Sequence, residues 1–121
     1  MNYGKLDDAF SLFIRHRDTV DGIGFCATCN KPLTIKTGQC GHFISRRHLS
    51  TRWDEKNCAI QCVSCNIFNQ GKQFEFSMYI EKKHGKGTCD LLTVKSRLIK
   101  KPSQFEIDTL RNHYLELVKK M

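Results

Sequence analysis

The 121-residue chain contains only two prolines, Pro32 and Pro102, and no stretch rich in proline, glycine or serine that would form a linker. No internal repeat or low-complexity tract is visible either. We therefore expect one domain spanning residues 1–121, a length that suits a single core. That core would be small, and domains of this size often use a metal ion or disulfides as an additional constraint.

Long hydrophobic runs are also absent. No window approaches the roughly 18 consecutive apolar residues of a membrane-spanning helix. The first ten residues contain acids and no apolar run, so we expect no secretory signal. The sequence thus predicts a cytoplasmic protein with no membrane partner. The seven cysteines are consistent with this location, because an odd number of cysteines without a secretory signal indicates reduced thiols. Metal binding is then the leading explanation for so many cysteines.

Negative charge is scarce. The chain has 12 Asp and Glu residues and 20 Lys and Arg residues, which gives a formal net charge of +8. Such a surplus points to an anionic partner. Charge alone does not choose between nucleic acid, an acidic protein and a membrane surface.

Hydrophobic residues at helical spacing predict supporting helices on both sides of an irregular centre. In the last helix, Ser103 and Glu106 form the pattern of a capping box. The centre, residues 22–71, is instead rich in Cys, Gly, Asn and His, and its short apolar pieces at 42–44 and 58–60 are typical of brief strands. We expect an α+β fold, mostly helical outside the centre. The predicted helices cover residues 5–17, 73–84, 90–99 and 103–120.

Two CxxC pairs are the strongest metal signal in the chain. Two thiolates separated by two residues can turn toward one tetrahedral ion, and a second pair completes a four-cysteine site. A redox CxxC would stand in a βαβ unit, which the pattern does not indicate, and an iron–sulfur cluster more often uses a tighter run. The sequence therefore predicts a structural zinc ion that makes the enclosed residues 30–61 rigid. Its ligands would be Cys26, Cys29, Cys62 and Cys65.

Three cysteines fall outside these pairs. We interpret Cys58 and Cys89 as small core residues. The role of Cys40 stays open, because it lies next to the histidine that carries most of the functional argument below.

The segment enclosed by the two pairs resembles known nucleases. His42, Asn57 and Asn66 follow one another as in the HNH nuclease motif, with Asn66 in the place of the final histidine. More closely, the pieces CGHFISRR, TRWDEKN and QCVSCNIFNQG resemble the NinG/Rap family of phage recombination proteins. The resemblance covers roughly residues 6–92, and the pieces together are far more specific than any one of them.

The resemblance implies a small zinc-stapled ββα-metal (HNH-like) centre and a metal-dependent DNA endonuclease. His42 would activate the attacking water, since a histidine with a pKa of about 6.5 is a competent general base. Asn57 would orient the His42 ring or its loop. A divalent ion, Mg²⁺ or alternatively Mn²⁺, would stabilise the leaving group, with Asn66 as one ligand.

One position departs from the common HNH pattern. Many HNH enzymes have a metal-ligating Asp immediately before the histidine, where this chain has Gly41, although the NinG/Rap pattern also has glycine there. The second protein ligand of the catalytic ion is therefore open. Candidates are Asp54, Glu55, His48 and Asn69.

Structural roles are alternatives for the same residues. A histidine beside glycine is more often structural than catalytic. Asn57 could cap a turn, and Asn66 could be the N-cap of the helix that follows.

The enclosed segment is also basic, and its cations could contact phosphates on either side of a cut. No recognition helix stands out, so we expect DNA binding directed by structure rather than sequence. These residues are Arg46, Arg47, Arg52 and Lys56. A second basic group, either a solvated face or a clamp on another DNA arm, contains Lys95, Arg97, Lys100 and Lys101.

The resemblance implies branched recombination intermediates, such as D-loops and Holliday junctions, as substrates, with recombination proteins as partners and a host bacterial cytoplasm as the location. A homodimer would match two-fold symmetric DNA, with the terminal amphipathic helix as its contact. The rival hypothesis is a zinc-stabilised DNA-binding or adaptor module that cuts nothing. A nonspecific or homing-type nicking enzyme would differ only in substrate.

Overall fold

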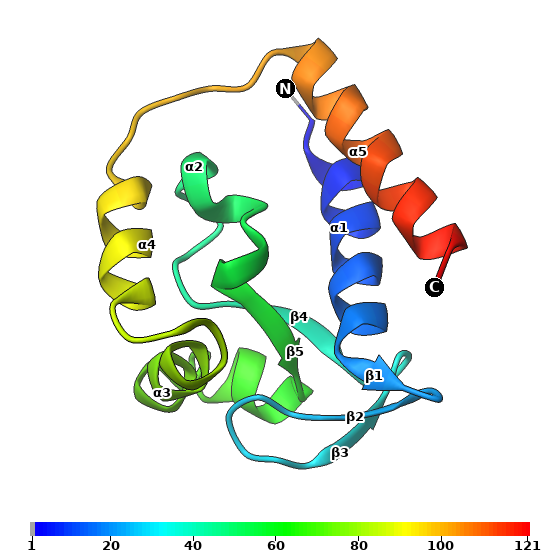
Figure 1. Cartoon of the computed structure of the whole chain (residues 1–121), viewed down its shortest axis with the longest axis vertical. Coiled ribbons are helices and arrows are strands. Elements are labelled where there is room, and N and C mark those ends of the chain that lie inside the picture. The colour runs from blue at the N-terminus through cyan, green and yellow to red at the C-terminus, as the bar shows by residue number, and fades with distance from the viewer. Residues whose placement is uncertain (1) are drawn as a thin grey trace.

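The computed structural model describes residues 2–121 and places helices around two small antiparallel sheets (Figure 1). The elements are α1 (Gly4–Arg17), β1 (Thr19–Val20), β2 (Ile23–Phe25), β3 (Pro32–Thr34), β4 (Gln39–His42), α2 (Leu49–Arg52), the 3₁₀ turn η1 (Glu55–Asn57), β5 (Cys58–Gln61), the π-helical turn η2 (Ser64–Phe68), α3 (Gln73–His84), α4 (Thr88–Ser96) and α5 (Gln104–Lys119). The mixed α+β fold is confirmed.

The hairpin of β4 and β5 lies at the centre of the molecule. The two strands pair antiparallel, with His42 opposite Cys58 and Gly41 opposite Ala59. Successive side chains of a strand point to opposite faces. Cys58 accordingly packs in the cluster built on α1, whereas Ala59 packs with α3 and α4. Helices thus cover both faces of the hairpin, which explains why all of β5 is buried.

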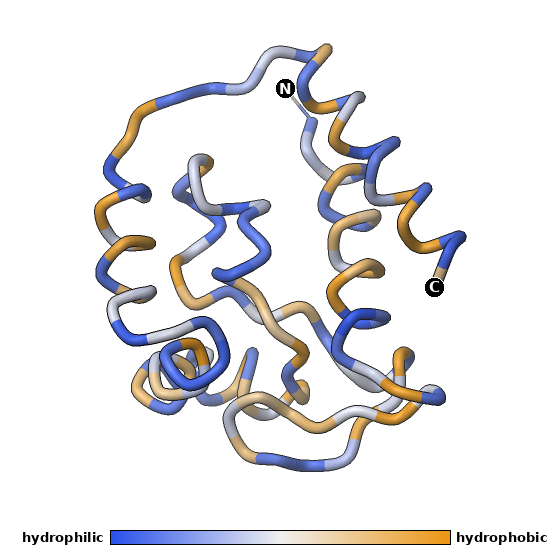
Figure 2. Tube along the Cα trace, viewed as in Figure 1, coloured by the Kyte–Doolittle hydropathy of each residue, from blue (hydrophilic) through white to orange (hydrophobic). Residues whose placement is uncertain are grey.

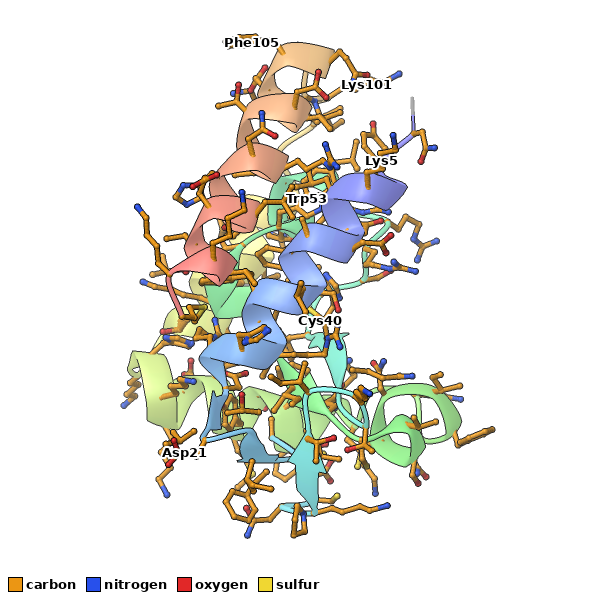
Figure 3. All side chains as sticks on the ribbon, turned by 90° about the vertical axis from the view of Figure 1, so that its right-hand side faces the viewer. Lys5, Asp21, Cys40, Trp53, Lys101 and Phe105 are labelled. Carbon is orange, nitrogen blue, oxygen red and sulfur yellow. The ribbon has the colours of Figure 1, made fainter. Side chains whose placement is uncertain are left out.

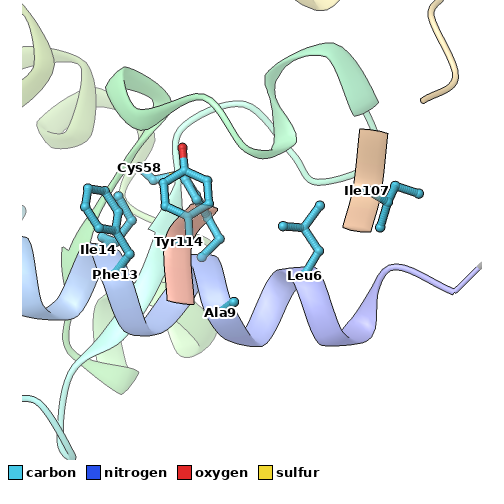
Figure 4. Packing of buried hydrophobic residues seen from close by; sticks show 8 residues of the cluster. Leu6, Ala9, Phe13, Ile14, Cys58, Ile107 and Tyr114 are labelled. Carbon is cyan, nitrogen blue, oxygen red and sulfur yellow. The ribbon is translucent and has the colours of Figure 1, made fainter. Parts of the chain in front are cut away.

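On one face, α5 packs along α1 (Figures 1 and 4). The ring of Tyr114 contacts Phe10 and Phe13, with centroids 5.0 and 4.9 Å apart. Figure 2 shows apolar residues recurring along both helices. The apolar face of α5, which the sequence offered for a homodimer contact, packs on α1 within the chain, and the homodimer stays a prediction.

The opposite face is covered by α3 and α4. Phe76, Ile80 and Leu92 are buried there against Ala59 of β5. From the end of α4 the chain crosses to α5 as an extended segment (Figure 1). None of the helices in the described part of the chain is long and apolar enough to cross a membrane.

All four predicted helices are present, and the capping box of Ser103 and Glu106 is formed. The predicted helix at 90–99 instead covers Thr88–Ser96. The residues expected to form its last turn are not helical. Leu98 and Ile99 are exposed there, so no burial of their side chains stabilises a further turn. The small sheet of β1, β2 and β3 was not predicted as such.

Candidate functional site

The cysteines of the two CxxC pairs converge on one point. Their four sulfur atoms all lie within 4.8 Å of one another, and the Sγ atoms of Cys29 and Cys62 are 3.7 Å apart. One pair comes from the turn between β2 and β3, and the other from the end of β5 and the start of η2. Four thiol ligands at this spacing fit tetrahedral zinc. The cluster could therefore hold a structural zinc ion that fastens the three-stranded sheet to the central hairpin.

Hydrogen bonds to sulfur support the metal-binding form of this cluster. The backbone N–H of Cys62 donates to Cys26 Sγ at 3.3 Å, and that of Cys65 donates to Cys62 Sγ at 3.4 Å. Burial opposes ionisation of Cys26, but hydrogen bonds from the Thr28 hydroxyl and the Cys62 amide outweigh it and lower the pKa of the thiol to about 6. Such outer contacts orient and tune metal ligands.

A cleft of about 490 Å³ opens between α1, β4 and η2. It brings His42 and Asn66, two of the residues singled out from the sequence, to one place. Its polar lining includes Asp7, Asp8, Gln39, His42, Arg46 and Asn66.

His42 is the last residue of β4 and its ring is held by the backbone. Its Nε2 lies 2.9 Å from the carbonyl oxygen of Arg52. A carbonyl only accepts, so Nε2 carries the proton and the lone pair of the neutral ring is on Nδ1. Burial lowers the pKa of His42 to about 4, despite the opposing effect of the Arg52 carbonyl. The ring is therefore neutral near pH 7 and can accept a proton.

Asn57 holds the loop beyond His42, and its side-chain hydrogen bonds go to that loop and to Thr51 rather than to the ring. Its Oδ1 accepts from the N–H of Ile44 at 2.8 Å. Its Nδ2 donates to the carbonyls of Ile44 and Thr51, both at 3.1 Å. The side chain is fully buried. Asn57 was expected to orient either the His42 ring or its loop. The hydrogen bonds in the structure are those that would orient the loop.

Arg52 is tied to α1. Its Nε donates to Asp7 Oδ1 at 3.0 Å, and its guanidinium lies over the rings of Tyr3 and Trp53 at 5.1 and 5.4 Å. Burial disfavours the charged form of Asp7, but hydrogen bonds from Arg52 and Trp53 outweigh it and lower the pKa of that carboxyl. This placement fits a bracing role for Arg52 better than the phosphate contact expected from the sequence.

The other cations of the segment lie at the surface. Arg46 lines the cleft and its Nη1 is 3.7 Å from Asp7 Oδ2, whereas Arg47 is exposed beside it. Lys56 is also exposed but does not line the cleft. The predicted DNA-binding residues are thus divided between the cleft, the surface near it and the bracing of the loop.

Gly41 has no room for a side chain. A Cβ at this position would lie 1.9 Å from Oε1 of Gln61. The Gln61 amide is fixed there because its Nε2 donates to Thr28 Oγ1 and to the Gly71 carbonyl, both at 3.0 Å. The neighbouring strand therefore excludes an Asp before His42.

The residues proposed as a second ligand for the catalytic ion do not lie in the cleft. Asp54 forms an ion pair with Lys95 at 2.6 Å, and Glu55 accepts a hydrogen bond from the Tyr114 hydroxyl at 3.0 Å. These interactions hold both carboxylates outside the cleft that His42 lines. His48 and Asn69, the other two candidates, are exposed outside the cleft as well.

Two carboxylates that the sequence analysis missed do reach the cleft. Asp7 and Asp8 stand in the first turns of α1, a helix recognised only by its apolar face. Asp8 is exposed, and among residues 2–121 it has no side-chain hydrogen bond or ion pair. Asn66 lines the same cleft, and its Nδ2 donates to Gln39 Oε1 at 2.8 Å. The sequence signal for Asp7 and Asp8 was an acidic pair on the polar side of an amphipathic helix, and nothing in the sequence links this pair to His42.

No curated protein and no solved structure matches the chain. The family model described as Bacteriophage Lambda NinG protein matches residues 3–121, which is nearly the whole chain. A match of this extent establishes the family. The chain therefore belongs to the NinG family of phage recombination-related proteins.

Proposed function

We propose that this chain is a metal-dependent HNH-type endonuclease that hydrolyses phosphodiester bonds in branched DNA, such as D-loops and Holliday junctions. The observation that carries the proposal is His42, a neutral histidine on the wall of a cleft, with Nε2 fixed by a backbone carbonyl and the lone pair of the ring on Nδ1. The branched substrate follows from membership of a recombination-related family.

The arrangement of elements supports the proposal. The antiparallel strands β4 and β5 are followed by the helical turn η2 and then α3. This order is compatible with the ββα centre that the resemblance implies. His42 ends the first strand, Asn57 precedes the second, and Asn66 lies in the turn after it. The resemblance to the HNH motif names these same three side chains.

In this proposal His42 takes the proton of the attacking water at Nδ1. General bases of this kind contribute typically about 10²–10⁴-fold to a rate. Asn57 keeps the loop in place, and the Arg52 carbonyl fixes the ring in the tautomer that leaves Nδ1 unprotonated. The low pKa of the free protein makes His42 a weak base, and an anionic phosphate beside it would raise that pKa toward neutrality.

The cleft offers hard oxygen ligands for a catalytic ion. The Asp8 carboxylate and the Asn66 amide oxygen belong to the ligand class that Mg²⁺ prefers. An unneutralised carboxylate would repel a DNA phosphate, so a bound cation also resolves the charge conflict in this cleft. When bound, Mg²⁺, or alternatively Mn²⁺, would supply electrostatic stabilisation of the leaving oxygen. Asp8 and Asn66 are the residues that would hold it.

DNA binding is assigned to the basic residues at the mouth of the cleft. Arg46 lines it and Arg47 is exposed next to it. Contacts of this type fix the position of the backbone and carry no base information. They suit an enzyme that selects DNA by its branching.

The direct test is cleavage of branched, linear and supercoiled DNA in the presence of Mg²⁺. The wild type should cut branched DNA, and His42→Ala should lose at least about 100-fold in rate. His113→Ala, which changes an exposed histidine of α5, is the matched control and should cleave normally. Circular dichroism establishes that the variants are folded.

Each other outcome has a definite meaning. Equal cleavage by wild type and His42→Ala would refute the role of His42. Similar rates on all three DNAs would remove the preference for branches and leave the nuclease. Tight binding of branched DNA with no cleavage in Mg²⁺ or Mn²⁺ would favour the adaptor alternative.

A further inference from the structure

A second group of metal-ligating side chains lies in the central hairpin, apart from the four-cysteine cluster. One ligand atom each of Cys40, His42 and Cys58 falls within 4.8 Å of the other two. The strands fix this geometry. Cys40 and His42 are two residues apart on β4 and share a face, and Cys58 of β5 is the direct partner of His42.

The chemistry of the group differs from that of the oxygen ligands in the same cleft. Two thiols and an imidazole are soft to borderline ligands, which suit Zn²⁺ and are poor for Mg²⁺. Three protein ligands leave the fourth position of a tetrahedral ion for water, as in zinc sites that stay open to solvent.

The group is buried at one end and accessible at the other. Cys58 is 1% exposed, whereas Cys40 and His42 line the cleft. Figure 3 shows Cys40 beside α1, which forms the facing wall. An ion entering through the cleft would therefore meet Cys40 and His42 directly, and Cys58 would supply the buried third ligand.

We propose that Cys40, His42 and Cys58 bind a second zinc-class ion, separate from the ion of the four-cysteine cluster. Nε2 of His42 is occupied by the Arg52 carbonyl, so Nδ1 is the nitrogen available to the ion. If the proposed nuclease function holds, this ion takes the lone pair that accepts the proton of water, and its binding switches cleavage off reversibly. Each thiol that binds releases its proton to solvent, and neither sulfur nor metal changes oxidation state.

The binding test counts ions on the full chain. Protein kept reduced and stripped of weakly held metal by a mild chelator is titrated with Zn²⁺, and in parallel with Co²⁺, whose thiolate absorption reports the ligand set. The wild type should bind one further equivalent beyond the tightly held ion. Cys40→Ser and Cys58→Ala should each lose that equivalent and keep the first.

Cys89→Ser is the matched control, because Cys89 belongs to neither group of ligands. It should bind like the wild type. Only one equivalent on the wild type, or a second equivalent that survives in Cys40→Ser, would overturn the proposal. Because Cys58 is buried, circular dichroism and retention of the first ion must show that Cys58→Ala is folded.

Cleavage assays separate this proposal from the nuclease proposal. In Mg²⁺, one free equivalent of Zn²⁺ should abolish cleavage by the wild type. Cys40→Ser, measured against its own rate without Zn²⁺, should be insensitive. A second bound ion on a protein that never cuts DNA would preserve the site and refute the nuclease. Zn²⁺-resistant cleavage by a wild type that has bound the second ion would refute the switch.

Discussion

At the scale of single residues, His42 combines features that the sequence could not supply together. It is neutral because it is buried, and its tautomer is fixed by the carbonyl of Arg52, ten residues further along the chain. Asp7 lies close enough to favour its charged form, but burial outweighs that effect. The result is a neutral histidine whose proton is on Nε2 and whose lone pair is on Nδ1.

A titration of His42 tests this description. We expect the ring to stay neutral as the pH falls through 6.5, the ordinary value, and to gain a proton only near pH 4. The unfolded chain then binds more protons than the folded chain between these values, so this residue costs stability as the pH falls from 6.5 toward 4. The measurement is ¹⁵N NMR of the imidazole, which also reports the Nε2–H tautomer. A midpoint near 6.5, or an Nδ1–H tautomer, would contradict it.

Gly41 shows at the same scale how a neighbouring strand decides a residue. From the sequence alone, there was no physical reason for the absence of Asp before His42. The structure supplies one, because the Gln61 amide occupies the space that a Cβ would need. The carboxylates of the cleft come instead from α1.

At the scale of elements, the helices were predictable because their apolar residues recur at helical spacing. The expected helix at 73–84 has those bounds, and that at 5–17 differs by one residue at its start. The short strands were only partly predictable. A two- or three-residue strand such as β1 or β3 has no periodicity to detect. The pairing of β3 with β2 also depends on the turn that carries Cys26 and Cys29.

The packing of α5 on α1 gives a prediction for Tyr114. This side chain is 3% exposed between Phe10 and Phe13, so Tyr114→Ala leaves a cavity in the interface of the two helices. Large-to-small changes of this kind cost about 3–5 kcal/mol, and we expect a loss of unfolding free energy in that range. Urea denaturation measures it. Asn112→Ala, at an exposed position of the same helix, is the control and should stay within about 0.5 kcal/mol of the wild type.

At the scale of the whole molecule, stability is divided among three small clusters of buried residues. One lies between α1 and α5, one around the four cysteines, and one under α3 and α4. Among residues 2–121, the cluster around the four cysteines contains only Leu33 and Ile60 besides cysteines. This cluster contributes little to the free energy of unfolding without a metal ion, since the hydrophobic contribution of two buried side chains is only about 3–6 kcal/mol.

Removal of zinc should therefore have a global effect. We expect about one tightly held zinc ion per chain, and strong chelation should unfold at least the three-stranded sheet and destabilise the hairpin it adjoins. Elemental analysis combined with circular dichroism during chelation measures both. A zinc-free protein that keeps its circular dichroism and its melting temperature would contradict the four-cysteine site.

The same scale shows why the site was only partly predictable. The cysteine pairs were identified from their spacing, and His42 and the two asparagines from the resemblance of one segment of the chain to the NinG/Rap family and the HNH motif. Asp7 and Asp8 were missed because they precede His42 by more than 30 residues and reach it only through the packing of α1 on β4. The grouping of Cys40 with Cys58 likewise required the register of the hairpin.

By itself, the sequence determined the helices, the four-cysteine cluster and the identity of the central histidine, because apolar periodicity, ligand spacing and the segment that resembles the NinG/Rap family are local properties of the chain. The tertiary structure alone decided which carboxylates share the cleft with His42, which cations are free, and which nitrogen of the ring carries the proton. These depend on contacts between segments that are distant along the chain, and such contacts exist only once the helices have packed on the hairpin.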